Sequence, residues 1–255
     1  MPTVIACFKW VIDEAYIRRG PTGDLDFSAV DYKIGEYDRN AIEEAVRLKE
    51  SLGGKAIAAT VGRPEAAKGV KDALSRGADE AYFAADDSFG NLDSSQTALV
   101  LAEVVRSSIK QYDLILCGEG SSDLYAQQVG PRLAEHLGIP CISFVQKLSI
   151  GKDQLAAERR VEEGIEVITA PLPALATVLP DINVSRIPGV KDTLMAGRKP
   201  TVKIMKDQLP PLSEPLLQTI SLTASRMERS CERFGTDAKE IARFVASLRK
   251  KGAIA

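Results

Sequence analysis

Short apolar runs alternate with amphipathic stretches along the first two-thirds of the chain. Each run is typical of a strand buried on both faces, and the runs cover residues 3–8, 55–61, 80–85, 113–117 and 140–145. Between them, apolar side chains recur at helical spacing, which predicts helices over residues 38–53, 64–77, 94–111 and 128–138. Alternating strands and helices predict an α/β fold with a doubly wound, mostly parallel sheet.

The pattern changes after residue 146. Residues 147–150, 154–161 and 164–171 read as antiparallel strands, with a Glu162-Glu163-Gly164 turn before the last of them. Two further apolar runs, at 174–179 and 200–205, are expected strands, and the mixed stretch between them reads as a structured loop with at most a short helix. We therefore expect one α/β domain over residues 1–206.

Residues 207–255 differ in composition from the domain before them. Pro210, Pro211 and Pro215 exclude a continuous helix there. An amphipathic helix is predicted over residues 237–252, with Ile241 and Phe244 on its apolar face. This stretch is expected to be an arm that packs on another subunit.

The composition argues against a nucleic-acid-binding or membrane-spanning protein. The 33 Lys and Arg residues nearly balance the 35 Asp and Glu residues, so the charge that nucleic-acid binding needs is absent. No apolar run approaches the roughly 20 residues of a membrane span, and the N-terminus does not read as a signal peptide. The four cysteines lack CxxC spacing and are expected to be free, buried thiols, which suits the cytoplasm.

Catalytic side chains do not emerge from the sequence. The single histidine, His136, cannot supply a His-rich metal site and is expected at a helix end. A Cys-His nucleophilic pair is the weaker alternative, because nothing nearby reads as an orienting third group. We therefore predict no catalytic residue and no metal site.

Ligands of open parallel sheets bind at the carboxyl ends of the strands, near the topological switch point. Three such ends carry suggestive residues: Cys7 to Lys9, Thr60 to Gly62, and Gly118 to Asp123. The third is the strongest, because small residues let main-chain amides approach a phosphate and the next helix start adds partial positive charge. An ordinary strand-to-helix turn explains the same residues, and Asp38 is expected to be a helix N-cap. Neither a GxGxxG fingerprint nor a P-loop is present.

Several segments, in order, resemble the β (small) subunit of electron transfer flavoproteins. They include KWVID at 9–13, AIEEAVRLKE at 41–50, DLILCGEGSSDLYAQQVGPRLAEHLGIP at 113–140 and NVSRIPGVKDTLMAGRKP at 183–200. The resemblance implies a fold of the adenine nucleotide alpha hydrolase type. It also implies a heterodimer with an α subunit that carries an electron-transferring FAD.

The resemblance further implies a nucleotide at the strand ends of the β subunit. That nucleotide is AMP in simple members of the family. In electron-bifurcating members it is a second FAD, which is reduced by NADH and divides electrons between ferredoxin or flavodoxin and a dehydrogenase. The run Gln128-Val129-Gly130-Pro131 looks more like the bifurcating members, so FAD is favoured over AMP.

Carried over by position, the resemblance assigns cofactor binding to residues on four segments. They are Cys7, Lys9, Gly35, Glu36, Tyr37, Asp38, Val61, Gly118, Glu119, Gly120, Ser121, Ser122, Asp123, Leu124, Tyr125, Ala126, Gln127, Gln128 and Val129. Two departures stand out: Gly35-Glu36 replaces a frequent Asn-Pro, and only Asp123 remains of the family's acidic run. Side-chain contacts to the nucleotide are therefore less secure than main-chain contacts.

Two further roles are implied. Arg159 matches an arginine that reaches the α-subunit flavin, where a cation raises the reduction potential; a surface charge on a hairpin is the alternative. Residues 183–200 match a loop that docks a partner flavin dehydrogenase, such as an acyl-CoA or 2-hydroxyacid dehydrogenase. Its docking residues are Arg186, Val190, Lys191, Leu194 and Met195, with Val190 as the apolar anchor. Arg186, Lys191, Arg198 and Lys199 give the loop a positive rim.

A nucleotide-binding stress-type protein or an ATP-using hydrolase is the rival from another class. Such proteins should carry a glycine-rich ATP-phosphate motif, and the sequence holds none.

Overall fold

The computed structural model describes residues 1–20, 24–212, 214–215, 217–223 and 231–254. The chain divides into two compact units. The larger comprises residues 1–18 and 27–220, and the smaller comprises residues 19–26 and 221–255.

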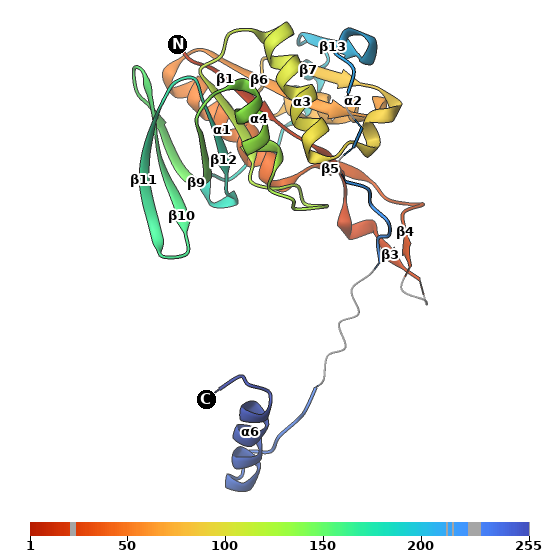
Figure 1. The fold of residues 1–255 in the computed structure, drawn as a ribbon, viewed down its shortest axis with the longest axis vertical. Helices are drawn as coiled ribbons and strands as arrows, with labels where there is room; N and C mark the ends of the chain where they lie inside the picture. The colour runs from red at the N-terminus through yellow and green to blue at the C-terminus, as the bar shows by residue number, and fades with distance from the viewer. Residues whose placement is uncertain (21–23, 213, 216, 224–230, 255) are drawn as a thin grey trace. The chain divides into compact units, whose positions relative to one another are not determined.

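A nine-stranded sheet forms the centre of the larger unit (Figure 1). Its strands, in spatial order, are β11 (Gly164–Pro171), β10 (Gln154–Val161), β9 (Cys141–Ile150), β12 (Ala174–Val178), β8 (Leu114–Gly118), β1 (Thr3–Cys7), β6 (Lys55–Gly62), β7 (Glu80–Ala85) and β13 (Thr201–Met205). The six strands from β12 to β13 are parallel to one another, and β9, β10 and β11 form an antiparallel meander. Short pairs form two small sheets: β2 (Trp10–Ile12) with β5 (Tyr32–Ile34), and β3 (Arg18–Arg19) with β4 (Leu25–Asp26).

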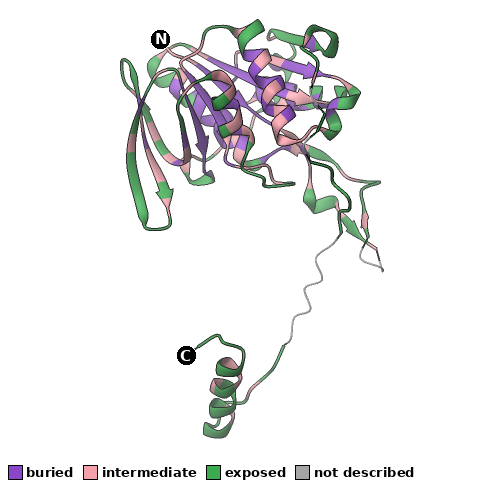
Figure 2. Cartoon of the chain, viewed as in Figure 1, coloured by how far each residue is buried: buried purple, intermediate pink, exposed green. Residues whose placement is uncertain are grey.

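Alternate residues of β1 point into two separate cores. Val4, Ala6 and Phe8 pack with α1 (Glu36–Leu52), α2 (Ala67–Ser75) and α5 (Val190–Ala196). Ile5 and Cys7 pack on the other face with α3 (Ser94–Val104) and α4 (Val129–Leu137). Figure 2 shows the central parallel strands as a buried layer, whereas β11, at the edge of the sheet, is largely exposed. The expected doubly wound, mostly parallel α/β fold is therefore confirmed.

The switch point lies between β1 and β8. From β1 the chain proceeds outward to β6 and β7, and then returns to place β8 on the opposite side of β1. In sheets of this type, ligands bind outside the carboxyl ends of the strands at such a switch point.

Three expected elements differ in extent. The two strands expected at 140–145 and 147–150 are one strand, β9, which pairs with β12 in its first half and with β10 in its second. The helix expected to reach residue 111 ends as α-helix at Val104 and continues as a π-helical turn over Val105–Ile109. The short helix expected within residues 180–200 is α5, which has seven residues.

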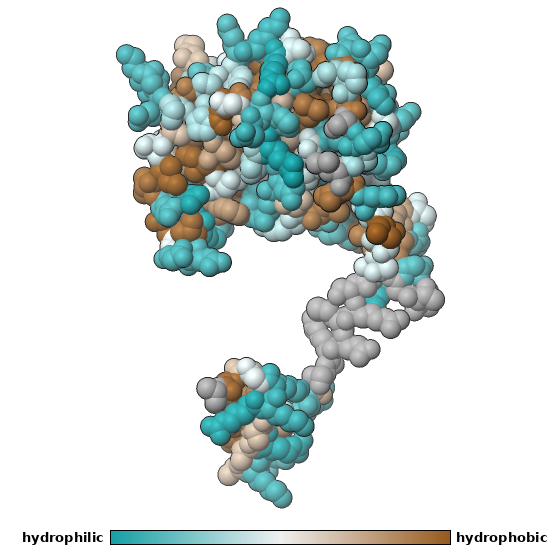
Figure 3. All heavy atoms as spheres, in the orientation of Figure 1, coloured by the Kyte–Doolittle hydropathy of each residue, from teal (hydrophilic) through white to brown (hydrophobic). Residues whose placement is uncertain are grey.

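The smaller unit contains α6 (Ala238–Lys250), within the predicted 237–252. Asp237 caps it by accepting hydrogen bonds from the amides of Lys239 and Glu240. Phe234 precedes the helix and contacts Phe244 edge-on, at 5.3 Å between ring centroids. Ile241 is 52% exposed and Phe244 is 42% exposed, so apolar side chains interrupt the hydrophilic surface of this segment (Figure 3). Among the described residues, no helix has the length and apolar character to cross a membrane.

Candidate functional site

The carboxyl ends of β1 and β8 are joined by the side chain of Asp38. One carboxylate oxygen accepts the amide of Lys9 at 2.8 Å, and the other accepts the amide of Gly118 at 3.2 Å. The N-cap of α1 is Gly35 rather than Asp38, so the expected capping role is wrong. Asp38 lies in the first turn of α1, where it turns inward and holds the two strand ends at the switch point.

Burial dominates the electrostatics of this carboxylate. Asp38 is only 7% exposed, and burial raises its pKa to about 7. The hydrogen bonds from the two amides oppose the rise, because they favour the ionised form. The carboxylate therefore titrates near neutral pH, directly beneath the loop that follows β8.

Gly118 allows α1 to approach the end of β8 closely. A Cβ atom on Gly118 would lie 2.5 Å from Oδ1 of Asp38 and 2.7 Å from Cβ of Tyr37. Both distances are too short for any side chain. The glycine that the sequence singled out is thus required by helix packing, and the first turn of α1 lies directly against it.

The loop from Glu119 to Gln128 is folded around the Glu119 side chain. Glu119 is buried and accepts hydrogen bonds from the Tyr125 hydroxyl, at 2.7 Å, and from the Gln127 side-chain amide. The Tyr125 ring lies 5.6 Å from the ring of Tyr37 on α1. Tyr125 and Gln127 both have positive φ, at 48° and 58°, a conformation that side chains disfavour. The helix expected to begin near residues 125–128 begins at Val129, beyond this irregular loop.

Ser122 carries an unpartnered polar atom in this loop. Its hydroxyl oxygen is buried and has no hydrogen-bond partner. Such a group costs roughly 1–3 kcal/mol when it is left unpaired. Beside it, the Lys9 ammonium forms a 2.6 Å ion pair with Asp123 at the exposed rim of the loop. The site combines an unpaired hydroxyl, a lysine and main chain flanked by glycines at the switch point. This combination fits an anionic, hydroxyl-rich ligand such as a nucleotide.

The cysteines near the strand ends are not suited to nucleophilic chemistry. Cys7 and Cys117 are buried on adjacent strands, and the neighbouring Cys7 thiol together with burial raises the pKa of Cys117. Cys141 and Cys231 are exposed, so the expectation that all four thiols are buried is wrong for these two. Within the described ranges, no group of three or more His, Cys, Asp or Glu side chains could hold a metal ion.

The remaining residues assigned to the cofactor lie in two places. Gly35, Glu36 and Tyr37 form the start of α1, and Val61 lies near the end of β6, next to β1. The structure therefore brings together the segments 7–9, 35–38 and 118–129. Arg159 lies elsewhere, on β10, with β9 and β12 between it and β8. Its guanidinium forms a 2.8 Å ion pair with Glu166 on β11.

The segment expected to dock a dehydrogenase exposes its apolar side chains. Val190 is 80% exposed, Leu194 72% and Met195 45%, whereas the one buried residue of α5 is Ala196. Lys191 is exposed as well. A helix that turns its apolar side chains outward is typical of an interaction surface.

Arg186 does not extend into solvent as a free cation. It forms a 2.8 Å ion pair with the buried Glu43 and a 2.7 Å pair with Glu50, both on α1. Asn40 and Glu44, also buried on α1, hydrogen-bond Asn183. The sequence analysis missed this polar stripe of α1. Its signal was present in the spacing of residues 40, 43, 44 and 50, which places them along one side of a helix.

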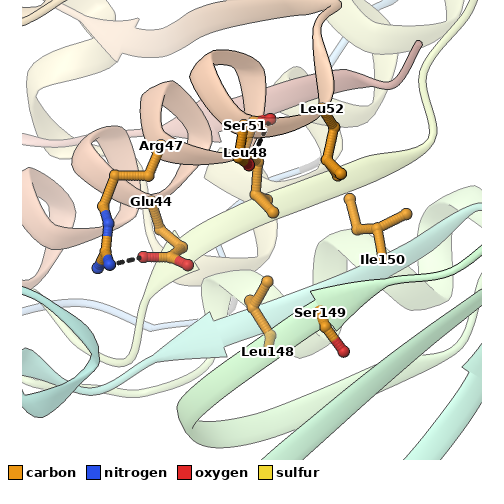
Figure 4. A pocket seen from close by; sticks show the side chains of 8 residues that line it. All are labelled: Glu44, Arg47, Leu48, Ser51, Leu52, Leu148, Ser149 and Ile150. Atoms are coloured by element: carbon orange, nitrogen blue, oxygen red, sulfur yellow. Dashed lines mark hydrogen bonds and ion pairs between the residues drawn. The ribbon is translucent and has the colours of Figure 1, made fainter.

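Two pockets lie away from the strand ends. Figure 4 shows the first, a cavity of about 280 Å³ between α1 and β9, with Leu48 and Leu148 facing each other and Glu44 paired to Arg47. The second is lined by Met1, Asp113 and Leu172, among others. Neither includes a residue that the sequence assigned to the cofactor.

The comparison with protein families gives one match. The model of the electron transfer flavoprotein domain matches residues 22–209, most of the 255-residue chain.

Proposed function

Because the chain belongs to the electron transfer flavoprotein domain family, we propose that it is the β (small) subunit of a heterodimeric electron transfer flavoprotein. In this proposal it binds an adenine nucleotide at the ends of β1 and β8 and supports electron transfer between a donor and a partner dehydrogenase. The observation that carries the proposal is the buried, unpartnered Ser122 hydroxyl in the loop after β8.

The residues that would hold the nucleotide come from the three segments that meet at the switch point. Ser122 would donate to a phosphate or ribose oxygen, Lys9 would offset phosphate charge, and the amides of Gly118 to Val129 would supply further donors. Asp38 would hold β1 and β8 in register beneath them. Tyr125 and Gln127, which now bond to Glu119, are the side chains that would change position.

The nucleotide decides between two versions of this function. If it is AMP, it is structural, and electrons pass only through the FAD of the α subunit. If it is FAD, this flavin would accept hydride from NADH, and the complex would divide electrons between ferredoxin or flavodoxin and a dehydrogenase. The resemblance of the Gln128–Pro131 run to bifurcating members favours FAD.

The other surfaces have roles in the same proposal. Arg159, on the β10–β11 hairpin, would lie near the α-subunit flavin, where its charge would favour the reduced anionic form. Its pairing with Glu166 would then have to weaken or rearrange. Val190, Lys191, Leu194 and Met195 would dock a flavin dehydrogenase, such as an acyl-CoA or 2-hydroxyacid dehydrogenase. Residues 207–255 would lie on the α subunit, and the complex would work in the cytoplasm.

The test is a count of nucleotides in the co-expressed heterodimer. The complex is purified, denatured, and its nucleotides are separated and quantified. One FAD and one AMP per heterodimer supports simple electron transfer, and two FAD supports bifurcation. One FAD with no second nucleotide would contradict the proposed site. ATP hydrolysis by the chain without its partner would instead support the ATP-using rival.

The Arg159 proposal has its own measurement. In the heterodimer, Arg159→Ala should lower the reduction potential of the α-subunit flavin, because a positive charge that favours the reduced form is lost. Arg160→Ala is the matched control, since Arg160 is the adjacent cation on β10 and pairs with Asp181. Equal potentials in both variants and the wild type would remove Arg159 from the flavin's surroundings.

A further inference from the structure

The exposed apolar helix α5 has little core of its own to hold it in place. It has seven residues, and only Ala196 among them is buried. A helix this short is not stable by itself in water. Its position therefore depends on its packing against α2, where Ala196 joins the core, and on the chain on either side of it.

The chain before α5 is held on α1 by charge. The Arg186 guanidinium donates to both oxygens of Glu43, at 2.8 and 3.0 Å, and to both oxygens of Glu50, at 2.7 and 3.0 Å. Its main-chain amide adds a third bond to Glu43, at 3.1 Å. Arg76, the residue that caps the carboxyl end of α2, donates to the main-chain oxygen of Arg186 at 2.9 Å. One residue thus ties the segment to two helices.

The chain after α5 is held on α2. The Lys199 ammonium donates to the main-chain oxygens of Leu74 and Ala78, at 2.8 and 2.6 Å. Leu74 lies in the last turn of α2, where a cation is favoured by the helix dipole, and Ala78 lies in the loop that follows the helix. Arg186 and Lys199 are therefore both directed toward the domain, and their side chains donate to its own acceptors.

We infer that Arg186 is a positioning residue for the proposed docking helix: its ion pairs with Glu43 and Glu50 fix the position from which Val190 and Leu194 meet a partner dehydrogenase. This inference rests on the proposed function. It differs from a positive-rim role, in which the Arg186 guanidinium itself would contact the dehydrogenase. The two roles have opposite consequences when the glutamates are neutralised.

The experiment uses the full heterodimer and steady-state electron transfer from a reduced dehydrogenase. The probe is an acyl-CoA dehydrogenase with its acyl-CoA or, if the wild-type complex does not accept electrons from it, a 2-hydroxyacid dehydrogenase with its hydroxy acid. Arg186→Met is expected to raise the KM for the dehydrogenase about tenfold, if the fraction of molecules with α5 in place falls to about a tenth. The kcat and the nucleotide content should stay within twofold.

Neutralising the glutamates separates positioning from direct contact. Glu50→Gln changes a side chain that is 53% exposed, and it should raise the KM. The double variant Glu43→Gln/Glu50→Gln should raise the KM further, because it weakens more of the hydrogen bonds to Arg186. If Arg186 contacted the dehydrogenase directly, the same substitutions would free its charge, and KM would fall or stay constant. Arg186→Lys should restore part of the affinity, because one ammonium can pair with one of the two carboxylates.

Amide hydrogen exchange tests the position of α5 without any dehydrogenase, and it also reveals a variant that has misfolded. Amide hydrogen exchange over residues 187–197 should accelerate in Arg186→Met, while exchange in β1 and β8 stays at the wild-type rate. Arg106→Met, at an exposed cation of the π-helical turn after α3 that pairs with Glu103, is the matched control and should change neither exchange nor KM.

Val190→Asp and Arg186→Met together distinguish a wrong positioning role from a wrong docking surface. If Val190→Asp lowers electron transfer but Arg186→Met changes neither KM nor exchange, the docking surface stands and the positioning role is wrong. If Val190→Asp leaves electron transfer at the wild-type rate, the docking proposal itself is wrong, and the positioning role is withdrawn with it.

Discussion

The strand-end region and the proposed docking segment both depend on a buried carboxylate of α1, but different groups hold it. Asp38, in the first turn, is held by two neutral main-chain amides. Glu43, farther along the helix, is held by the guanidinium of Arg186. Burial of a carboxylate favours its protonated form, and an adjacent cation opposes that effect.

The two regions should therefore respond to pH in opposite ways. The raised pKa of Asp38 means that its contribution to stability is present at low pH and is lost as the pH rises toward 7. The Arg186 pairs act in the opposite sense, because the guanidinium lowers the pKa of Glu50, and that contribution is lost as the pH falls. One helix therefore carries two anchors that weaken at opposite ends of the pH range.

The largest expected effect is a pH dependence that belongs to Asp38. Its pKa is about 7 in the folded chain and 3.8 in the unfolded chain, a difference worth about 4 kcal/mol between pH 4 and pH 8. The wild type should lose this stability as the pH rises, and Asp38→Asn should not. Urea unfolding of both proteins across this range measures the difference. Asp31→Asn, at an exposed position, should follow the wild type, and parallel curves for wild type and Asp38→Asn would contradict the assignment.

The second effect tests the contact between the same turn of α1 and β8. Gly118→Ala should destabilise the chain by about 3 kcal/mol, the upper end of the usual overpacking cost, because the new methyl would overlap Asp38 and Tyr37. Gly197→Ala, at a helical backbone position in the docking segment with 3.9 Å of clearance, is the matched control. Comparable unfolding midpoints for the two variants would show that α1 can withdraw from the strand end without cost.

The third effect tests the other anchor. A double-mutant cycle with Arg186→Met and Glu43→Gln should give a coupling energy of about 2 kcal/mol, because the two side chains share hydrogen bonds and one of them is buried. Glu50 remains as a second partner for Arg186 and keeps the value moderate. The same cycle between Arg186→Met and Asp38→Asn should give nearly zero. Equal coupling in both cycles would mean that the two anchors are not independent.

Most of the fold could be predicted from the sequence because it rests on hydrophobic period and turn residues. The parallel strands, the three-stranded meander and the helices around Ala41, Val70 and Ala98 follow from patterns that burial on one or both faces imposes. The length of β9 could not, since Phe144 has a positive φ of 62° in mid-strand and interrupts the alternation that marks a strand. The π-helical turn after Val104 likewise leaves no mark in the apolar spacing.

The candidate site was predicted as a set of segments but not as a set of contacts. The glycines at 118 and 120 and the serines beside them indicated the loop, because small residues near a strand end let main-chain amides approach a ligand. An ordinary turn explained the same residues, and Gly118 is in fact required by helix packing. The position of Asp38 could not be predicted, since an acidic residue in a first helical turn reads as a cap and its inward rotation depends on β1 and β8. Arg186 was assigned to the surface for the same reason: its partners, Glu43 and Glu50, are over a hundred residues away in sequence.

The smallest effect concerns the Ser122 hydroxyl, and it distinguishes a ligand-binding group from a defect in packing. Ser122→Ala removes a buried hydroxyl that has no partner, so the nucleotide-free chain should become more stable by about 1 kcal/mol. If that hydroxyl holds a nucleotide, AMP should bind the nucleotide-stripped heterodimer about tenfold more weakly, which is about 1.4 kcal/mol in the opposite direction. Urea unfolding and calorimetric titration with AMP measure the two terms.

Ser149→Ala is the matched control, because this serine is exposed on β9, outside the segments that meet at the switch point. It should change neither quantity. Opposite signs at Ser122 require a group that folding leaves unsatisfied and a ligand satisfies. A gain in stability with unchanged AMP affinity would leave Ser122 as a flaw in packing, and the ends of β1 and β8 would then lose the observation on which the nucleotide proposal depends.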